Sequence, residues 1–508
     1  MAKSSSYLTS IKPCAYRYKT EKEMSNIKDL QPKEVWKHFY TLTRIPRPSK
    51  NEAEIIAYMK KFGEDLGLET IIDDVENVII KKPATPGYEN RKTIVLQGHL
   101  DMVPQKNSDK VFDFKTDPIE TIIDGEWVTA DGTTLGSDNG MGVAATMAVL
   151  ESKTLKHGPI EALFTIDEET GMTGAFGLKP GLLDADILIN LDSEDEGEVY
   201  VGCAGGIDVN ASRSYTEEVT PSGMVAYTIN AKGLKGGHSG MDIILGRANA
   251  NKIIFRFLMQ AEADLNIRLA EAAGGDLRNA IPREAHALVA VPHGKAAEFE
   301  QLVAHYESIY KSEFAETEPD LAFTCEKADL PAKVVDAEEQ YKFIRAIFAC
   351  PHGVQRMSQS MEGLVETSTN LAIVKISGGK FEALSLTRSS VDSAKEATAW
   401  KIAAVFHLID AKVELQGEYP GWKPNLDSPI LKTCREVYNK EFGKIPEIKA
   451  IHAGLECGLL GGVYPNLDMI SFGPTIRFPH SPDEKVKIDT VDKFWKFLVA
   501  VLAAVPEK

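Results

Sequence analysis

The chain has 508 residues, of which 43% are apolar and 26% charged, and its formal net charge is −17 at pH 7. This length exceeds the usual size of one hydrophobic core, so we expect two domains. No stretch offers the roughly 18 uninterrupted apolar residues that a membrane span needs. A surface this acidic repels nucleic acid and anionic lipid, so we exclude nucleic-acid and membrane partners.

The cysteines and the N-terminal segment predict a cytoplasmic location. The six cysteines are scattered and form no CxxC pair, which argues against a thiolate zinc site or a redox motif. Residues 1–24 lack the apolar core of a signal peptide, so we interpret them as a loose extension, with Met24 as an alternative start. Without an export signal, the cysteines are expected to stay reduced.

The first part of the chain is expected to form an α/β layer structure. Residues 32–68 carry apolar side chains at three- and four-residue steps, which predicts helices. Short apolar runs at 93–96, 162–166 and 187–191 are typical of buried strands, and residues 139–150 predict a helix rich in small residues. Buried strands that alternate with helices favour a largely parallel sheet.

The pattern changes near Gly205-Gly206. From there to about Tyr419, alternating strand patterns at 225–231 and 287–291 accompany amphipathic helices at 247–265 and 295–314. A similar order returns after Pro331, with a helix over 337–349 and strands over 371–376 and 383–387. This order suggests a doubled α+β unit, although no clear repeat exists at the level of residues.

The α/β pattern resumes after Tyr419, with a helix over 430–442, a strand over 468–472 and a closing helix over 489–504. We therefore predict an α/β fold with a mostly parallel central sheet flanked by helices, made of residues 25–205 and 420–508. An α+β lid domain of residues 206–419 would be inserted into it. A cleft between two such bodies is a common location for a ligand site.

Each apolar run of the first domain ends in side chains that can bind a metal ion. The first run leads to His99, the second to Glu168-Glu169 and the third to Asp192. Because ligand sites of open α/β sheets lie at the carboxyl ends of the strands, these side chains should converge on one edge.

Two more candidate ligands stand near these positions. Asp138 precedes the predicted helix at 139–150, and His480 follows the apolar strand at 469–472. Two imidazoles and three carboxylates, taken from these six residues, suit zinc or a similar divalent ion. Five ligands exceed the needs of one tetrahedral ion with an open position, so two ions that share a bridging carboxylate fit the count better.

Each of these residues also has a simpler explanation when it is taken alone. A single histidine at a strand end is often structural, Asp138 is a suitable helix N-cap, and Glu168-Glu169 is typical of a solvated turn. Asp192 lies in an acidic run, and Asp101, a further candidate two residues after His99, is an acceptable turn residue. Their coincidence argues against these explanations, because independent surface acids have no reason to follow apolar strands repeatedly.

Five motifs carry a family resemblance. In chain order, GHLDMV, GSDNGMG, DEETGMTGA, NLDSED and FPHSPDE resemble those of the zinc-dependent peptidases that include aminoacylases, carboxypeptidase G and carnosinases. Within that clan the chain is most similar to bacterial aminoacyl-histidine dipeptidases, from about Leu30 to the C-terminus. The resemblance implies a zinc-peptidase catalytic domain with a lid, and hydrolysis of dipeptides, Xaa-His in particular.

The resemblance also implies roles for single residues. Asp101 would orient His99 as an outer carboxylate does, and Glu168 would be the general base. Two zinc ions would be bound, one by His99 and Asp192 and the other by Glu169 and His480, with Asp138 as the bridge.

Further residues are implied to bind a small peptide. His238, in a glycine-rich loop without the Lys-Ser/Thr ending of a P-loop, would stabilise the oxyanion. Asn279 and Arg388 would bind substrate; an arginine fork suits a carboxylate, although Arg388 alone is equally typical of a surface cation. Gly454 would line the pocket, and Glu456 would pair with the free amino group of the substrate.

Several alternatives stay open. An N-acyl amino acid deacylase or a tripeptidase of the same clan would use the same chemistry, and a metal-binding protein without catalysis would normally have lost a ligand or the base. A nucleotide-binding module lacks its fingerprint after a first strand. Manganese and cobalt accept the same ligands as zinc. A homodimer is a further prediction left open, since the lid histidine of some relatives crosses to a neighbouring subunit.

Overall fold

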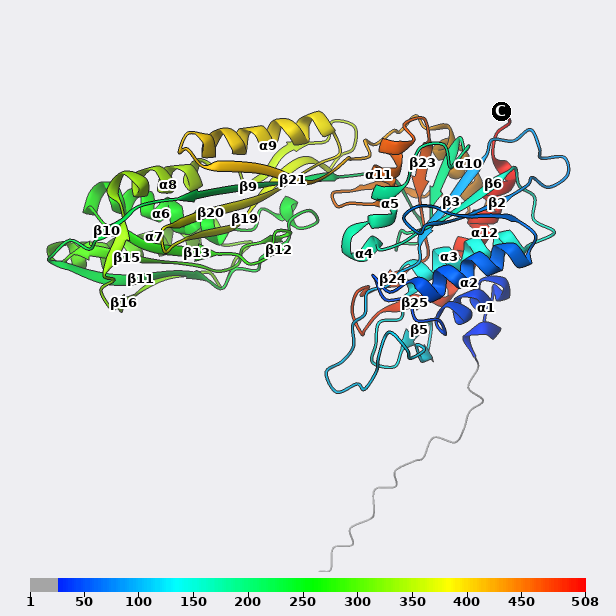
Figure 1. Ribbon diagram of the computed structural model, residues 1–508, viewed down its shortest axis with the longest axis horizontal. Coiled ribbons are helices and arrows are strands. Elements are labelled where there is room, and N and C mark those ends of the chain that lie inside the picture. Colours follow the sequence, from blue (N-terminus) through cyan, green and yellow to red (C-terminus); the bar gives the residue numbers. More distant parts are fainter. Residues whose placement is uncertain (1–25) are drawn as a thin grey trace, which may run out of the picture.

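A computed structural model describes residues 26–508, so the predicted extension over residues 1–24 lies outside the described part. Figure 1 shows two lobes, one built from both ends of the described chain and the other from its middle. Each lobe has its own large hydrophobic core. Over residues 26–508, no helix is both long enough and apolar enough to cross a bilayer.

The first lobe contains an eight-stranded mixed sheet with a parallel centre. β3 pairs in parallel with β6 and β7, and β7 pairs in parallel with β23. Antiparallel pairings involve β1, β2 and β8. The predicted α/β sheet is confirmed, and its strands lie in the order β1 (Glu69–Ile72), β2 (Val78–Lys82), β6 (Ile160–Thr165), β3 (Ile94–His99), β7 (Ile187–Asn190), β23 (Asp468–Ser471), β8 (Glu198–Cys203) and β22 (Glu447–Ile451).

The three predicted apolar strands form the middle of this sheet. Every residue of β3, β6 and β7 is buried, as expected for strands covered on both faces. Since these strands are parallel, their carboxyl ends meet at one edge. His99 is the last residue of β3, and Asp192 follows β7 by two residues.

Helices pack closely around this sheet. α3 (Ser137–Glu151) lies against β3, and a Cβ atom on Gly142 would stand only 2.5 Å from the carbonyl oxygen of Leu191. Small residues are therefore required where α3 approaches the strand ends. The remaining helices of this lobe are α1 (Lys33–Leu42), α2 (Ala53–Asp65), α4 (Glu168–Gly171), α5 (Thr173–Gly177), α10 (Pro429–Phe442), α11 (Glu456–Val463) and α12 (Ile488–Ala504). A small antiparallel sheet contains β24 (Ile476–Arg477), β25 (Lys485–Lys487), β5 (Trp127–Ala130) and β4 (Thr121–Asp124).

The second lobe, which we call the lid, is a nine-stranded antiparallel sheet with four helices. Its main strands lie in the order β16 (Ala322–Ala328), β11 (Met224–Lys232), β15 (Ala285–Pro292), β13 (Arg268–Gly274), β19 (Val365–Ser377), β20 (Lys380–Ser389), β9 (Gly205–Ser214) and β21 (Lys412–Tyr419), and β18 (Gly353–Met357) pairs with β19. The helices are α6 (Ala250–Leu265), α7 (Ala296–Glu313), α8 (Ala337–Ala349) and α9 (Asp392–His407). Two short ladders join β10 (Glu217–Val219) to β17 (Lys333–Val335), and β12 (Gly237–His238) to β14 (Ala280–Ile281).

The topology of the lid confirms that an α+β unit is doubled. One unit runs β11, α6, β13, β15, α7, β16, and the other runs β9, α8, β19, β20, α9, β21. In both units the strands lie in the spatial order fourth, first, third, second. The first unit is inserted after the first strand of the second unit, so the repeat is interrupted along the sequence.

The chain enters and leaves the lid at one place (Figure 1). A Cβ atom on Gly205 would stand 2.4 Å from the carbonyl oxygen of Tyr419, so the two crossing segments lie against each other. We propose that the lid begins after residue 205 and ends at residue 419, as predicted from the sequence. The change from the first sheet at Cys203 to the lid sheet at Gly205 supports it.

Candidate metal centre and active site

Asp138 lies between two histidines that are far apart in the sequence. Its Oδ1 atom is 3.1 Å from Nε2 of His99, and its Oδ2 atom is 3.3 Å from Nε2 of His480. His99 ends β3 and is buried, whereas His480 follows β24 and its side chain is about half exposed. The N-cap explanation for Asp138 does not describe this arrangement, since both of its carboxylate oxygens face imidazoles.

Two more carboxylates complete the cluster. Oδ1 of Asp192 lies 3.4 Å from Nε2 of His99, and Oε2 of Glu169 lies 2.9 Å from Nε2 of His480. The polar atoms therefore form two groups that share Asp138, one with His99 and Asp192 and the other with Glu169 and His480. The structure thus brings together all five residues that the sequence analysis predicted as ligands.

The donor atoms of this cluster fit divalent metal ions. Oε1 of Glu169 and Oδ1 of Asp192 are buried and form no hydrogen bond within residues 26–508, although Oδ1 of Asp192 lies 3.4 Å from Nε2 of His99. Buried carboxylate oxygens without partners are costly unless a cation compensates them. Imidazole nitrogen and carboxylate oxygen are the usual ligands of zinc and of similar transition metals.

Asp101 and Glu168 lie directly beside this cluster. Oδ1 of Asp101 is 3.2 Å from Nδ1 of His99, on the side of the ring away from Asp138. Asp101 also accepts hydrogen bonds from the backbone N–H groups of Glu168 and Glu169, at 3.0 and 3.2 Å. Burial raises the pKa of Glu168 well above the ordinary carboxyl range, and the nearby carboxylates of Asp192 and Glu456 raise it further.

Glu484 holds the loop that carries Asp138. Its buried carboxylate accepts backbone N–H bonds from Leu135, Gly136 and Ser137 at 2.8, 3.0 and 2.7 Å, and a further bond from the Ser137 hydroxyl. Glu484 lies within the FPHSPDE motif, but the motif predicted no role for it. No pattern could have shown it, because its partners are backbone groups more than three hundred residues away.

The buried guanidinium of Arg47 supports the same loop and was also missed by the sequence analysis. It donates to the carbonyl oxygens of Leu100 and Asp101 at 2.9 and 2.8 Å, and to that of Gly136 at 2.5 Å. The chain segments that follow β3 and precede α3 are therefore tied together through one side chain. The hydrogen bonds of Glu484 and Arg47 therefore restrict the movement of the loop that carries Asp138.

Three predicted substrate-binding residues lie in the lid close to Ser239. His238 is the last residue of β12 and stands opposite Ala280 of β14. The carbonyl oxygen of the exposed Asn279 accepts from the N–H of Ser239 at 2.8 Å, and the Nε of Arg388 lies 3.4 Å from the Ser239 hydroxyl oxygen. The Asn279 side chain forms no hydrogen bond within the described residues, so the structure places Asn279 nearby without showing what it binds.

The lid segment that contains Ser239 and Met241 faces the metal-ligating residues across one pocket. This pocket has a volume of about 330 Å³ and is lined on its lid side by Met241. Gly454 also lines it, and a Cβ atom there would stand 3.4 Å from the hydroxyl oxygen of Tyr419. The same hydroxyl accepts a 3.0 Å hydrogen bond from Arg388, so Tyr419 connects the pocket wall to that cation. The catalytic wall of the pocket includes Asp138, Glu168, Glu169, Asp192, Glu194 and His480.

The structure does not place Glu456 at the wall of the pocket, as the predicted contact with the amino group of a substrate would need. Glu456 begins α11, is fully buried, and does not line the pocket. Its Oε2 atom accepts hydrogen bonds from Gln97 at 2.5 Å and from Thr165 at 2.7 Å, both beneath the strand ends. Burial raises the pKa of Glu456 to about 7. The motif placed this residue correctly near the site, but its side chain turns into the core.

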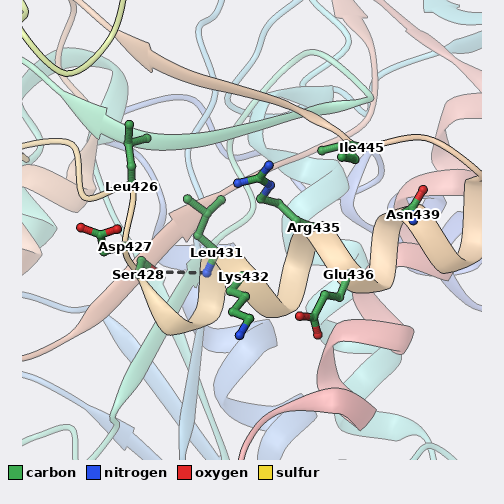
Figure 2. A pocket seen from close by; sticks show the side chains of 9 residues that line it. All are labelled: Leu426, Asp427, Ser428, Leu431, Lys432, Arg435, Glu436, Asn439 and Ile445. Carbon is green, nitrogen blue, oxygen red and sulfur yellow. Dashed lines mark hydrogen bonds between the residues drawn. The ribbon is translucent and has the colours of Figure 1, made fainter.

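A second hollow, of about 500 Å³, lies elsewhere on the first lobe (Figure 2). It runs along α10 between the exposed side chains of Leu426 and Ile445, with Arg435 among its polar groups. Its wall contains neither histidine nor cysteine. The pocket at the Asp138 cluster is therefore the better candidate for metal-dependent chemistry.

Replacing Glu484 with glutamine should weaken metal binding. One carboxylate oxygen would become an N–H₂ group that faces the N–H donors of residues 135–138, so the Asp138 loop would have to shift. Loss of such an outer contact typically costs about 10- to 100-fold in metal affinity. Competition with a chromophoric chelator measures the zinc affinity, and Asp483→Asn makes the same chemical change on the exposed neighbouring residue. Equal zinc affinities for both variants would contradict the role of Glu484.

Comparisons with known proteins agree with this geometry. The chain is 47% identical to a cytosol non-specific dipeptidase of Escherichia coli, over 96% of this chain and 100% of the relative. The crystal structure of an aminoacylhistidine dipeptidase from Vibrio alginolyticus is similar with a TM-score of 0.91 and 51% identity, covering 95% of this chain and 99% of the other. An aminopeptidase structure from Bacillus cereus shares only the fold, with a TM-score of 0.55 and 17% identity over 94% of this chain and 99% of the other.

The match to a family extends over most of the chain. Residues 95–504 match the sequence profile of peptidase family M20/M25/M40. This range contains the whole Asp138 cluster, Glu168, the lid and its Arg388. The chain therefore belongs to peptidase family M20/M25/M40.

Proposed function

We propose that this protein hydrolyses the peptide bond of dipeptides at a centre of two zinc ions. Both highly similar relatives are named dipeptidases, and the family is one of peptidases. The observation that carries the proposal is the position of Arg388, a buried cation that reaches the wall of the metal-ligand pocket through Tyr419. A dipeptide presents a carboxylate to such a cation one residue away from its single peptide bond.

We propose two metal ions because the candidate ligands form two groups. Asp138 belongs to both groups of polar atoms, and each of its oxygens faces a different histidine. His99 and Asp192 would hold one ion, Glu169 and His480 the other, and Asp138 both. Zinc suits these ligands, and manganese or cobalt can replace it according to availability.

Glu168 is the proposed general base. When bound, a pair of divalent ions polarises the scissile carbonyl and makes water more acidic. Glu168 lines the pocket, and one of its oxygens lies within 4.8 Å of the ligand atoms of His99 and Glu169. It would take a proton from the attacking water and deliver it to the leaving amine, which is typically worth about 10²–10⁴-fold in rate.

His238 is proposed to stabilise the oxyanion as a neutral hydrogen-bond donor. Its Nδ1 atom accepts from the N–H groups of Gly240 and Met241, at 3.2 and 3.0 Å, so the proton of the neutral ring belongs on Nε2. Burial lowers the pKa of His238, and the charge of Arg388 lowers it further. The ring therefore stays neutral at neutral pH and offers one N–H to a developing negative charge.

Arg388 is proposed to bind the carboxylate of the substrate. Its side chain is buried, yet within residues 26–508 no carboxylate forms an ion pair with it, and its polar contacts are Ser239 and Tyr419. A buried guanidinium without an anionic partner favours binding of a carboxylate in bidentate geometry. Asn279 is proposed to assist from the same lid segment.

Finer points of specificity and assembly are also proposals. We propose that Xaa-His dipeptides are substrates among others, since one relative is named for aminoacylhistidine and the other is named non-specific. A deacylase or tripeptidase of the same clan is the alternative. Met241, from the same lid segment as His238, lines the pocket within one chain, which supports the proposal that His238 acts in its own subunit. The homodimer and the cytoplasmic location stay predictions.

A substrate panel tests the proposed function. Purified protein with added zinc should cleave β-Ala-His, Gly-His and Ala-Ala, and chelation should abolish all cleavage. The same dipeptides with an amidated carboxyl terminus should react at least about tenfold more slowly, because Arg388 would lose its anionic partner. Cleavage confined to N-acetyl amino acids or to Gly-Gly-His would favour the deacylase or the tripeptidase. No cleavage by zinc-loaded protein would contradict enzymatic function.

Glu168→Gln should abolish turnover but leave zinc binding intact. The amide keeps the size of the side chain but cannot accept the proton of water, so kcat should fall by about 10²–10⁴-fold. Zinc content and the affinity for a dipeptide, measured by calorimetry on the variant, should match those of the unaltered protein. A variant that keeps more than about a tenth of the normal rate would remove Glu168 from the role of base.

A further inference from the structure

A continuous chain of buried hydrogen bonds runs beneath the metal-ligating strand ends. Ser193 and Ser471 are joined at 2.6 Å, the Ser471 hydroxyl donates to Oδ1 of Asn190 at 2.5 Å, and Nδ2 of Asn190 donates to Oε1 of Gln97 at 2.6 Å. Nε2 of Gln97 then donates to Oε2 of Glu456 at 2.5 Å. All five side chains are buried.

The direction of every bond in this chain is determined. Since the Ser471 hydroxyl gives its proton to Asn190, the Ser193 hydroxyl must donate to Ser471. Each amide uses its oxygen to accept on one side and its nitrogen to donate on the other. The donors therefore all point toward Glu456, whose Oε2 atom accepts both from Gln97 and from the Thr165 hydroxyl. Glu456 is thus the terminal acceptor of the whole chain.

The chain of hydrogen bonds crosses the central strands of the sheet at one level. Gln97 of β3 stands opposite Asn190 of β7, and Asn190 stands opposite Ser471 of β23. The neighbouring positions in these strands are apolar, such as Leu96 and Ile189. Polar side chains are costly at such positions unless each is fully paired, and a fully paired network specifies one register and one set of side-chain conformations.

The hydrogen-bonded residues of these strands come only two or three positions before the residues of the metal centre. Gln97 precedes His99 by two residues, so both side chains leave β3 on the same face. Asn190 ends β7 two residues before Asp192, and Thr165 ends β6 three residues before Glu168. A change in the Gln97 or Asn190 side chain would therefore be transmitted directly to His99 or Asp192.

We propose that Glu456 is a positioning residue, which anchors this chain of hydrogen bonds and thereby holds the ends of β3, β6, β7 and β23 in the arrangement that binds metal. The inference rests on the proposed metal centre. It replaces the substrate-binding role that the motif suggested, because Glu456 acts from beneath the strands through Gln97 and Thr165. No substrate contact is required of it.

Two substitutions at Glu456 test the inference. Glu456→Met removes the acceptor of two buried donors, so zinc affinity should fall about 10- to 100-fold, as for loss of other outer contacts. Glu456→Gln keeps an oxygen at the Oε2 position, and its N–H₂ group takes the position of Oε1, which has no partner among the described residues. This variant should bind zinc within about threefold of the unaltered protein, and so rescue the defect.

Two further variants separate positioning from general stability. Ser471→Ala removes the donor to Asn190 and should also weaken zinc binding, which keeps the test decisive if Glu456→Met fails to fold. Tyr310→Phe removes a buried 2.8 Å hydrogen bond to the Ile253 carbonyl within the lid, and should lower the melting temperature without changing zinc affinity. If Tyr310→Phe and Ser471→Ala change zinc affinity equally, the loss reflects stability alone and the inference is wrong.

The decisive readouts are zinc affinity by chelator competition and the division of dipeptide kinetics into kcat and KM. The inference predicts that kcat falls in Ser471→Ala at full zinc loading, with KM changed less than about threefold, because the lid residues proposed to bind substrate are untouched. Equal zinc affinity in all variants, or equal losses in Glu456→Gln and Glu456→Met, would overturn it. Reduced zinc affinity in a protein that cleaves no dipeptide would refute the proposed function but retain the inference.

Discussion

The contact of both Asp138 oxygens with imidazole nitrogens is the arrangement on which the rest of the site depends. Around it the structure collects the carboxylates of Glu168, Glu169 and Asp192 in a largely buried space. Carboxylates this close repel each other unless positive charge lies between them. The nearby guanidinium of Arg47 donates to backbone carbonyl groups rather than to these carboxylates. Divalent cations are therefore the compensation that the donor set favours.

The fold supplies this arrangement from three directions. Parallel strands bring His99 and Asp192 to one sheet edge, α3 presents Asp138 at its first turn, and the segment after β24 brings His480 across from the other side. Two of these directions are secured by a buried polar group that touches no ligand atom: Gln97 below the strands, and Glu484 at the Asp138 loop. The geometry of the metal centre thus depends on side chains that are not themselves ligands.

Charge is divided between the two lobes in a way that suits a short zwitterionic peptide. The first lobe holds the acidic side chains of the pocket and, by proposal, the metal ions, whereas the lid holds Arg388 and His238, the proposed binders of the carboxylate and the oxyanion. In a dipeptide, the carboxylate lies one residue away from the carbonyl of the peptide bond. By this proposal the lid would bind the carboxylate, and the metal centre would hold the carbonyl. His238 and Arg388 come from different copies of the doubled α+β unit.

Much of this organisation was predictable from the sequence, because it follows from local patterns. The apolar runs at 93–96, 162–166 and 187–191 became the central strands, and the predicted helix at 337–349 matches α8. What the sequence did not indicate depends on long-range contacts. Glu484 acts through distant N–H groups, and Glu456 turns inward from the first position of α11.

The central claim is that Asp138 joins two metal positions, and the number of bound ions tests it most directly. After equilibrium dialysis against zinc, elemental analysis of the unaltered protein should give two ions per chain. His480→Ala removes a ligand of one position only and should give one ion per chain. A single ion in the unaltered protein, or an unchanged count in His480→Ala, would contradict the account.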